Sequence, residues 1–407
     1  MDDNAELDAI LAEYADPETG PAPVETEPAL AETEPVEPEV RAPIEPTVGR
    51  AIAAESAAVD ARVVESRALG AFFGQAIADA AALQVEDCAT STIEDRHPTG
   101  VNYPSRGAYK GYAPNDWTDA TDTTILTARS LTDYFLSKTE DPVQNMAQKL
   151  HHWTKNGFSE HGDTGGLTPE GIVLKATLVP GFTHDPVSAA RSIRGPKADN
   201  GSLIRSMPCA FTAAPSDWAT LYSDVTHADD RARAASVAYV GLLSILLNLK
   251  PGESPKGSDA TAAIKEGCAC IEEEHPHSPT SYTRRRDYLS RLTQSTKVAS
   301  LMLDERDHRS YTLKTLACAM WAYRQLVRTP RADWTAEFFK TTVRAIAARG
   351  GDATANCAVV GAILGAAMGI EALPGDWVDG LPHGAWLRNE VMNFLSAAKI
   401  TWGDAPK

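Results

Sequence analysis

The sequence predicts an all-α fold, a compact multi-helix bundle that follows an acidic N-terminal segment. Two observations lead to this prediction. Apolar residues recur at helical spacing along nearly the whole chain after residue 50, and no stretch shows the alternation that is typical of β-strands. A chain of 407 residues, 43% hydrophobic and 23% charged, is also long enough to bury a large core. We therefore expect one helical domain over residues 51–402.

The first 50 residues differ from the rest in composition. They hold eight prolines and 14 acidic residues against two arginines, so they supply −12 of the formal net charge of −17. Such a segment buries too little apolar surface to offset chain entropy, and we expect it to be disordered. Within residues 4–15, four apolar side chains share one face of a possible short helix: Leu7, Ile10, Leu11 and Tyr14. This pattern is either chance in an acidic tail or a helix that docks onto a protein partner.

Helices follow one another along the domain. The first long one, Ala68–Leu83, carries Gly70 and Gly74, which permit another helix to approach closely. The expected helices are Arg50–Val64, Ala68–Leu83, Thr124–Lys138, Pro142–Asn156, Pro186–Arg194, Arg231–Asn248, Ala260–Glu274, Asp287–Leu303, Ser310–Arg328, Trp334–Arg349, Asn356–Ile370 and His383–Ala398.

Composition also excludes several classes of protein. The acidic balance argues against general nucleic-acid binding, and the sequence has no P-loop, no G-x-S-x-G elbow and no H-E-x-x-H motif. Cysteines at irregular spacing favour a reducing compartment, and no second Cys/His pair at finger spacing accompanies Cys268 and Cys270. The N-terminus lacks a signal-peptide pattern, and no uninterrupted apolar run reaches membrane-spanning length. We expect a cytoplasmic protein without a membrane partner.

Two stretches of similar composition each open an apolar helix. Trp117–Thr124 reads W-T-D-A-T-D-T-T, and Gly350–Asn356 reads G-G-D-A-T-A-N. Hydroxyl and carboxylate oxygens at a helix start are suited to holding a hard cation. We interpret the two stretches as partners across one site.

Together with other blocks in the same order, these stretches make the chain from Ala68 to about Leu395 resemble the ADP-ribosylglycohydrolase family. The match is spread over the domain, which makes it more specific than a single motif. The blocks are Gly70–Glu86 (the first-helix pattern G-x-x-x-G-x-A-x-G-D-A-x-G-x-x-x-E), Trp117–Thr124 (W-T-D-D-T), Asp163–Gly165 (D-x-G), Asn200–Arg205 (N-G-S-x-M-R), Val225–Asp229 (T-H-x-D) and Gly350–Asn356 (G-G-D-T-D-T).

The resemblance implies an all-helical bundle in which two magnesium ions hold the ribose diols of ADP-ribose while an acidic residue assists cleavage of the glycosidic bond. By position, Thr118, Asp119 and Asp352 correspond to metal ligands, and Glu86 corresponds to the acidic residue. The implied catalytic residues are thus Glu86, Asp119 and Asp352. Asp79 is expected to tie helices together.

Three positions depart from the family pattern. Ala120 and Thr354 stand where the family has aspartates, and Ala355 stands where it has a threonine ligand. Three of six ligands are therefore absent, which leaves a single magnesium ion held with waters, or none. Asp122 lies on the same helical face as Asp119 and is a candidate replacement ligand. The alternative for Asp122 is a solvated charge or a helix cap.

The remaining candidate residues concern the ligand. Asn200, Gly201 and Ser202 are expected to cradle a pyrophosphate, while Arg205 either binds a phosphate or anchors an internal carboxylate. The resemblance places the turn Asp163, Thr164 and Gly165 in the same pocket. Trp117 either flanks the adenine or the acceptor, or packs within its loop.

Two functions follow from these residues. The first is hydrolysis of an ADP-ribose glycosidic linkage, with ADP-ribose or an ADP-ribosylated molecule as the partner. The second is a catalytically inactive ADP-ribose binder or scaffold of the same fold. The first function is favoured by Glu86, Thr118, Asp119, Asp352 and the loop that begins at Asn200. The second is favoured by Ala120, Thr354 and Ala355.

Overall fold

The computed structural model describes residues 61–104, 111–166, 171–195, 197–274 and 279–403. Within these ranges the chain folds into α-helices and short 3-10 turns without a β-strand, so the predicted all-α class is confirmed. The acidic segment 1–50 lies outside the described residues. The helices are α2 (Ala61–Ala82), α3 (Thr90–Arg96), α4 (Asp119–Phe135), α5 (Pro142–Asn156), α6 (Gly171–Thr177), α7 (Pro186–Ser192), α8 (Gly201–Arg205), α9 (Pro215–Asp224), α10 (Asp230–Leu247), α11 (Gly257–Glu274), α12 (Pro279–Gln294), α13 (Thr312–Arg328), α14 (Ala336–Ala347), α15 (Ala353–Met368), α16 (Gly375–Val378) and α17 (Gly384–Gly403).

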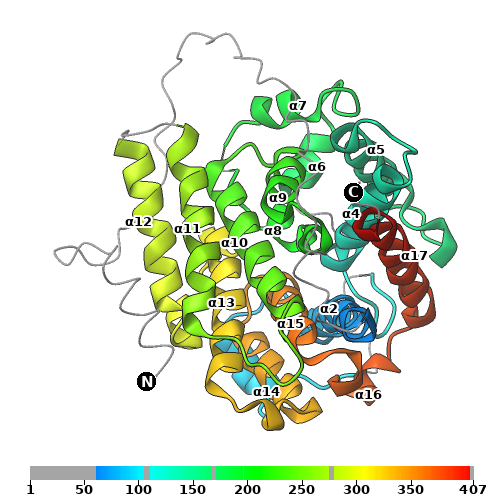
Figure 1. Cartoon of the computed structure of the whole chain (residues 1–407). Helices are drawn as coiled ribbons and strands as arrows, with labels where there is room; N and C mark the ends of the chain where they lie inside the picture. Colours follow the sequence, from blue (N-terminus) through cyan, green and yellow to red (C-terminus); the bar gives the residue numbers. More distant parts are fainter. Residues whose placement is uncertain (1–60, 105–110, 167–170, 196, 275–278, 404–407) are drawn as a thin grey trace.

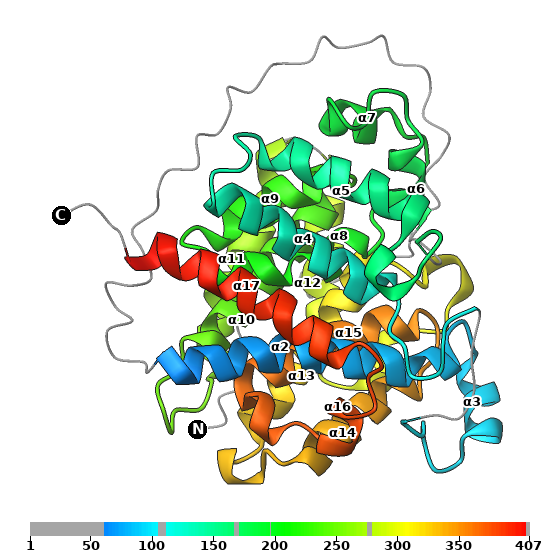
Figure 2. The same cartoon turned by 90° about the vertical axis from the view of Figure 1, so that its right-hand side faces the viewer.

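Helices α2 and α15 form the centre of the bundle and lie side by side in both views (Figures 1 and 2). Every residue of α2 from Arg67 onward is buried. The two backbones meet at glycines: a Cβ atom on Gly365 would lie 1.8 Å from the carbonyl oxygen of Gly70, and one on Gly74 would lie 2.3 Å from that of Gly361. Only residues without a side chain allow this approach, as predicted for the first helix.

The other helices cover this pair on several sides. Helix α10 packs against α9, α11 and α13, and α11 and α12 form one edge of the molecule in Figure 1. Helix α4 packs between α5 and α17 on the opposite edge. Helix α14 lies against α15 at the bottom of the same view. The N-terminal ends of α4 and α15 are thereby brought near the C-terminal end of α2.

Several predicted helix boundaries were wrong. The helix expected at Asp287–Leu303 is α12, which starts at Pro279 and ends at Gln294, and a separate 3-10 turn follows at Val298–Leu301. Both segments place apolar side chains in the core, for example Leu292 and Leu301. The apolar residues therefore keep a helical spacing in the sequence although the helix itself ends. Helix α4 begins five residues earlier than predicted, at Asp119, because Thr118 caps it.

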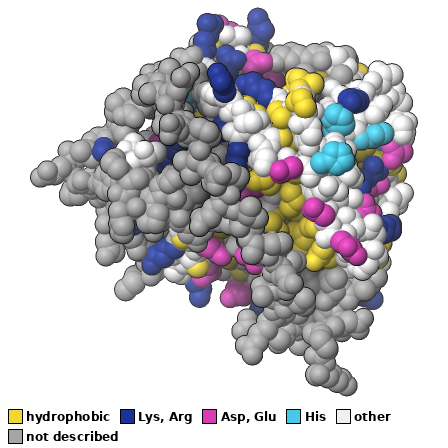
Figure 3. Space-filling view, turned by 90° about the horizontal axis from the view of Figure 1, so that it is seen from above, with side chains coloured by type: hydrophobic (Ala, Val, Ile, Leu, Met, Phe, Trp, Pro, Cys, Tyr) yellow, Lys and Arg dark blue, Asp and Glu magenta, His cyan; other side chains and the backbone are white. Residues whose placement is uncertain are grey.

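The surface and the longest apolar helix add two further facts. Seen from above, over α5, α6 and α7, the molecule shows hydrophobic side chains between basic side chains and histidines (Figure 3). Leu174 and Leu178 belong to the few large apolar side chains that are exposed among the described residues. The stretch Ala61–Val85 is long and apolar enough to cross a membrane by length and composition, although charged residues interrupt it, and 94% of its apolar window is buried in this bundle.

Candidate active site

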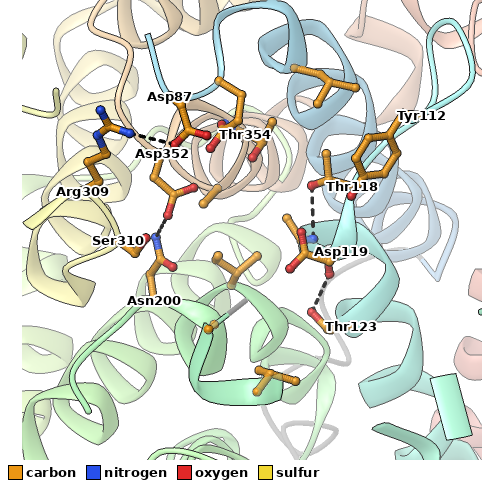
Figure 4. A pocket seen from close by; sticks show the side chains of 18 residues that line it. Asp87, Tyr112, Thr118, Asp119, Thr123, Asn200, Arg309, Ser310, Asp352 and Thr354 are labelled. Atoms are coloured by element: carbon orange, nitrogen blue, oxygen red, sulfur yellow. Dashed lines mark hydrogen bonds and ion pairs between the residues drawn. The ribbon is translucent and has the colours of Figure 1, made fainter. Parts of the chain in front are cut away.

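A cavity of about 270 Å³ lies between the N-terminal ends of α4 and α15. The segment that follows α2, helix α6, the start of α8 and the loop before α13 also contribute to its walls (Figure 4). The side chains around it are mostly polar, and four of them are acidic. Its described lining consists of Leu83, Glu86, Asp87, Tyr112, Thr118, Asp119, Ala120, Thr123, Gly171, Val173, Asn200, Gly201, Ile204, Arg309, Ser310, Asp352, Thr354 and Ala355.

The α4 side of the cavity is held by a buried carboxylate from α2. Asp79 Oδ1 accepts a hydrogen bond from Thr118 Oγ1 at 2.8 Å, and Oδ2 accepts from the Thr118 N–H at 3.1 Å and from Thr121 Oγ1 at 2.7 Å. Burial raises the pKa of Asp79 to about 7, although these hydrogen bonds oppose the shift. Asp79 therefore ties α2 to α4, as the sequence indicated, and fixes the position of Thr118.

The α15 side contains the second predicted block and Glu86. Glu86 Oε2 accepts a hydrogen bond from the Thr354 N–H at 2.8 Å. The neighbouring backbones are also paired, since the Asp87 N–H donates to Gly351 O at 2.8 Å and the Gly351 N–H donates to Cys88 O at 3.0 Å. Burial, with a further contribution from the charge of Asp352, raises the pKa of Glu86 to about 8. These surroundings favour the protonated form of the Glu86 carboxyl group.

The predicted ligand loop lies only partly in the cavity. Asn200 and Gly201 line it, and the Asn200 amide donates from Nδ2 to Asp352 Oδ2 at 3.0 Å (Figure 4). Ser202 does not line the cavity, since it is buried behind the loop, where its hydroxyl receives a hydrogen bond from Ser223 at 3.1 Å. Arg205 does not line the cavity either: it is buried and donates to Tyr222 O at 2.9 Å and to Thr226 Oγ1 at 2.5 Å, a carbonyl and a hydroxyl oxygen in place of the internal carboxylate expected from the sequence.

Asp122 is neither a ligand of this site nor a solvated charge. Its Oδ1 accepts from the indole N–H of Trp117 at 2.8 Å, and its Oδ2 accepts from that of Trp153 at 3.1 Å. Burial raises the pKa of Asp122 well above its usual value. Asp122 is not among the described residues that line the cavity, and its two bonds join the start of α4 to α5, so the structure supports neither interpretation made from the sequence.

Trp117 and the D-x-G turn also lie elsewhere. Trp117 is buried against the rings of His161, His383 and Trp386, so the packing alternative holds for this residue. Asp163 Oδ2 accepts the Phe158 N–H at 2.9 Å and closes its own turn. Asp163, Thr164 and Gly165 are not among the described residues that line the cavity.

Sequence reasoning missed one charged pair at the cavity. Arg309, in the loop before α13, donates from Nη1 to Asp87 Oδ1 at 2.9 Å. Both side chains line the cavity beside Asp352 (Figure 4). No motif marks Arg309, because it belongs to a run of mixed charges that is typical of a surface loop. The sequence pointed to this pair only through Asp87, which directly follows the candidate residue Glu86.

Comparison with known proteins agrees with this architecture. The family model described as ADP-ribosylglycohydrolase matches residues 60–404. The chain belongs to the ADP-ribosylglycohydrolase family.

Relatives within the family are distant. The chain is 24% identical over 318 residues to "ADP-ribosylarginine hydrolase Tri1" of Pseudomonas putida (strain GB-1), which covers 77% of this chain and 73% of the relative. It is 23% identical over 324 residues to "ADP-ribosyl-[dinitrogen reductase] glycohydrolase" of Rhodospirillum rubrum, with 78% and 91% covered. A solved structure titled "ADP-ribosylglycohydrolase-related protein complex" matches with a TM-score of 0.55 and 21% identity, over 83% of this chain and 99% of that one. This last likeness shows the ADP-ribosylglycohydrolase fold.

The two-magnesium centre implied by the ADP-ribosylglycohydrolase resemblance does not fit the side chains present here. Ala120 and Ala355 line the cavity without offering an oxygen ligand from their side chains, and Thr354 offers a hydroxyl in place of a carboxylate. Among the described residues, no group of three or more His, Cys, Asp or Glu side chains is placed to hold a metal ion. Divalent cations of this kind need several oxygen ligands in fixed geometry. A reaction at this site therefore has to depend on the protein's own groups.

Proposed function

We propose that this protein hydrolyses the glycosidic bond between an ADP-ribosyl group and its acceptor, with Glu86 as the proton donor. The observation that carries the proposal is the position of the Glu86 carboxyl group in the wall of a polar cavity, where desolvation and the charge of Asp352 favour its protonated form. A general acid works best when its pKa lies near the working pH. Both curated relatives named above act on ADP-ribosyl linkages by their names, which supports the same class of bond here.

The first step breaks the bond between the anomeric carbon of the ribose and the acceptor. Glu86 gives its proton to the leaving acceptor atom, and the bonding electron pair leaves with that atom. Positive charge then develops on the ribose ring, and the carboxylates of Asp119 and Asp352 in the cavity walls stabilise it.

The second step consumes a water molecule. The water oxygen attacks the anomeric carbon, and the Glu86 carboxylate takes up the proton that the water loses. ADP-ribose and the free acceptor leave, and Glu86 is protonated again. The hydrogen bond from the Thr354 N–H to Glu86 Oε2 stabilises the carboxylate between the two steps.

A second function, binding of ADP-ribose without turnover, is favoured by Ala120, Thr354 and Ala355. These residues occupy positions at which the family resemblance implies metal ligands. A cavity with this lining still offers carboxylate and amide groups to the hydroxyls of a ribose.

Calorimetric titration with ADP-ribose and a turnover assay on an ADP-ribosylated protein separate the two functions, each with EDTA and with magnesium. We expect wild-type protein to bind and to release ADP-ribose. In Glu86→Gln, turnover should fall by about 10²–10⁴-fold, the usual contribution of a general acid, while binding is retained. Glu337→Gln, a matched change at a side chain that is 74% exposed, should leave turnover unchanged.

Each other outcome has a definite meaning. Binding without turnover in the wild type would support the inactive binder. Equal turnover in Glu86→Gln and wild type would remove Glu86 from the mechanism. Absence of ADP-ribose binding would exclude both functions.

A further inference from the structure

The carboxylate of Asp352 is turned away from the helix that it begins. Asp352 is the N-cap residue of α15, yet its side chain makes no capping hydrogen bond to that helix. An N-cap aspartate ordinarily accepts from the N–H two or three positions further along. Here the Thr354 N–H is bonded to Glu86 Oε2 at 2.8 Å. The cap of α15 therefore comes from another part of the chain, and Asp352 faces the cavity (Figure 4).

Asn200 holds Asp352 in that direction. Its Nδ2 donates to Asp352 Oδ2 at 3.0 Å and to Thr315 Oγ1 at 2.9 Å. Thr315 uses its own hydrogen for Asn356 Oδ1, at 2.8 Å. The Thr315 oxygen must therefore accept from Asn200, which assigns both hydrogens of the Asn200 amide and fixes its orientation.

This relay lies in the interior. Asn200, Thr315 and Asn356 have no exposed surface, and a hydrogen bond to an ionised carboxylate is stronger in such surroundings than in water. The relay connects α8, α13 and α15, so it gives the amide a rigid support on two helices. Asp352 is thus oriented by a group that is itself held in one position.

We propose that Asn200 is a positioning residue, which turns the Asp352 carboxylate from its own helix into the cavity wall where the ribose hydroxyls bind. The inference deepens the proposed function and rests on it only for the identity of the ligand. Without Asn200, the Asp352 carboxylate has an alternative within reach, because the first turn of α15 presents backbone N–H groups.

The direct test is a crystal structure of Asn200→Ala. We expect the Asp352 carboxylate to rotate onto the first turn of α15 as an ordinary N-cap. An Asp352 side chain that keeps its direction would overturn the proposal. If Asn200→Ala does not fold, Asn200→Asp has the same size and sets a second carboxylate against Asp352, so the same rotation is expected and the same result would overturn the proposal.

A binding measurement separates positioning from a purely structural role. Tyr222→Phe is the matched control, because it removes a buried hydrogen bond, to Ser130, at a side chain outside the described cavity lining. Affinity for ADP-ribose should fall about tenfold, or 1.4 kcal/mol, in Asn200→Ala and less than about threefold in Tyr222→Phe, although both lower the melting temperature. Equal losses of affinity in the two variants would contradict a positioning role.

The two proposals fail in different ways. Absence of turnover in wild type, together with rotation of Asp352 in Asn200→Ala, would remove the hydrolase and leave the positioning role intact. Turnover in wild type, together with an Asp352 side chain that does not rotate in Asn200→Ala, would remove the positioning role and leave the hydrolase intact.

Discussion

Replacement of Glu86 by glutamine should change how the stability of the protein depends on pH. The folded protein keeps the proton of Glu86 up to a pKa of about 8, whereas an exposed glutamate loses it near 4.3. Between these values the folded state binds more protons than the unfolded state, so the free energy of unfolding falls as pH rises. Glutamine has no proton to lose and accepts the same hydrogen bond from Thr354.

The size of this change in the free energy of unfolding follows from the shift in the pKa of Glu86. One pKa unit corresponds to about 1.36 kcal/mol, so between pH 5.5 and pH 8 the Glu86 contribution to the free energy of unfolding should fall by about 3 kcal/mol. Below pH 4 the contribution is fully present, and above pH 8 it changes no further.

Urea unfolding at pH 5.5, 7.0 and 8.5, followed by tryptophan fluorescence, measures this change. The pKa values of the buried Asp79 and the partly buried Asp116 are raised into the same range, so the relevant quantity is the difference between wild type and Glu86→Gln. We expect this difference to change by about 3 kcal/mol across the range, and by nothing for Glu337→Gln. Parallel curves for wild type and Glu86→Gln would refute the assignment of a raised pKa to Glu86.

Three further predictions concern the glycine contact in the core, the bonds of Asp122 and the response to magnesium. Gly365→Ala should lose soluble, folded protein, because its Cβ would meet backbone at 1.8 Å, whereas Gly375→Ala, with nothing within 4 Å, should match wild type in a thermal melt. Asp122→Asn should lower the free energy of unfolding by about 1–3 kcal/mol, because one indole N–H loses its acceptor; an unchanged urea midpoint would argue against this contact. The melting temperature of wild type should be the same in EDTA and in about 5 mM magnesium, whereas that of the double variant Ala120→Asp/Thr354→Asp should rise with magnesium. A rise in the wild type would contradict the conclusion that its cavity has too few oxygen ligands for the metal centre.

The sequence predicted the helical class and the central contact well, because both depend on local patterns. A single stretch of the sequence shows both the helical spacing and the two glycines, Gly70 and Gly74. In the structure these glycines lie at the contact between α2 and α15. The helix breaks were less predictable. The segment after Gln294 keeps its apolar spacing through a 3-10 turn, so periodicity alone does not reveal the change.

The errors at the site have a common cause, since each depends on a partner that is distant in the chain. In the sequence, Asp122 looks like a solvated acidic residue in the first turn of a helix. Its partner, the indole N–H of Trp153, lies 31 residues further along the chain. Ser202 reads as part of a phosphate loop until Ser223 is found behind it. Glu86, by contrast, lines the cavity, as the resemblance implied from its position relative to the first helix, and its catalytic role stays a prediction.

The last turn of α2 and the segment that follows it hold both walls of the cavity. Asp79, on α2, holds Thr118 and thus the start of α4, and Glu86, after α2, holds Thr354 and thus the start of α15. Helices α2 and α15 also interlock at their glycines, so the helical walls are fixed from two directions. An enlarged cavity for a bulkier ligand is therefore best sought in the loop before α13, which carries Arg309, and not in the helices.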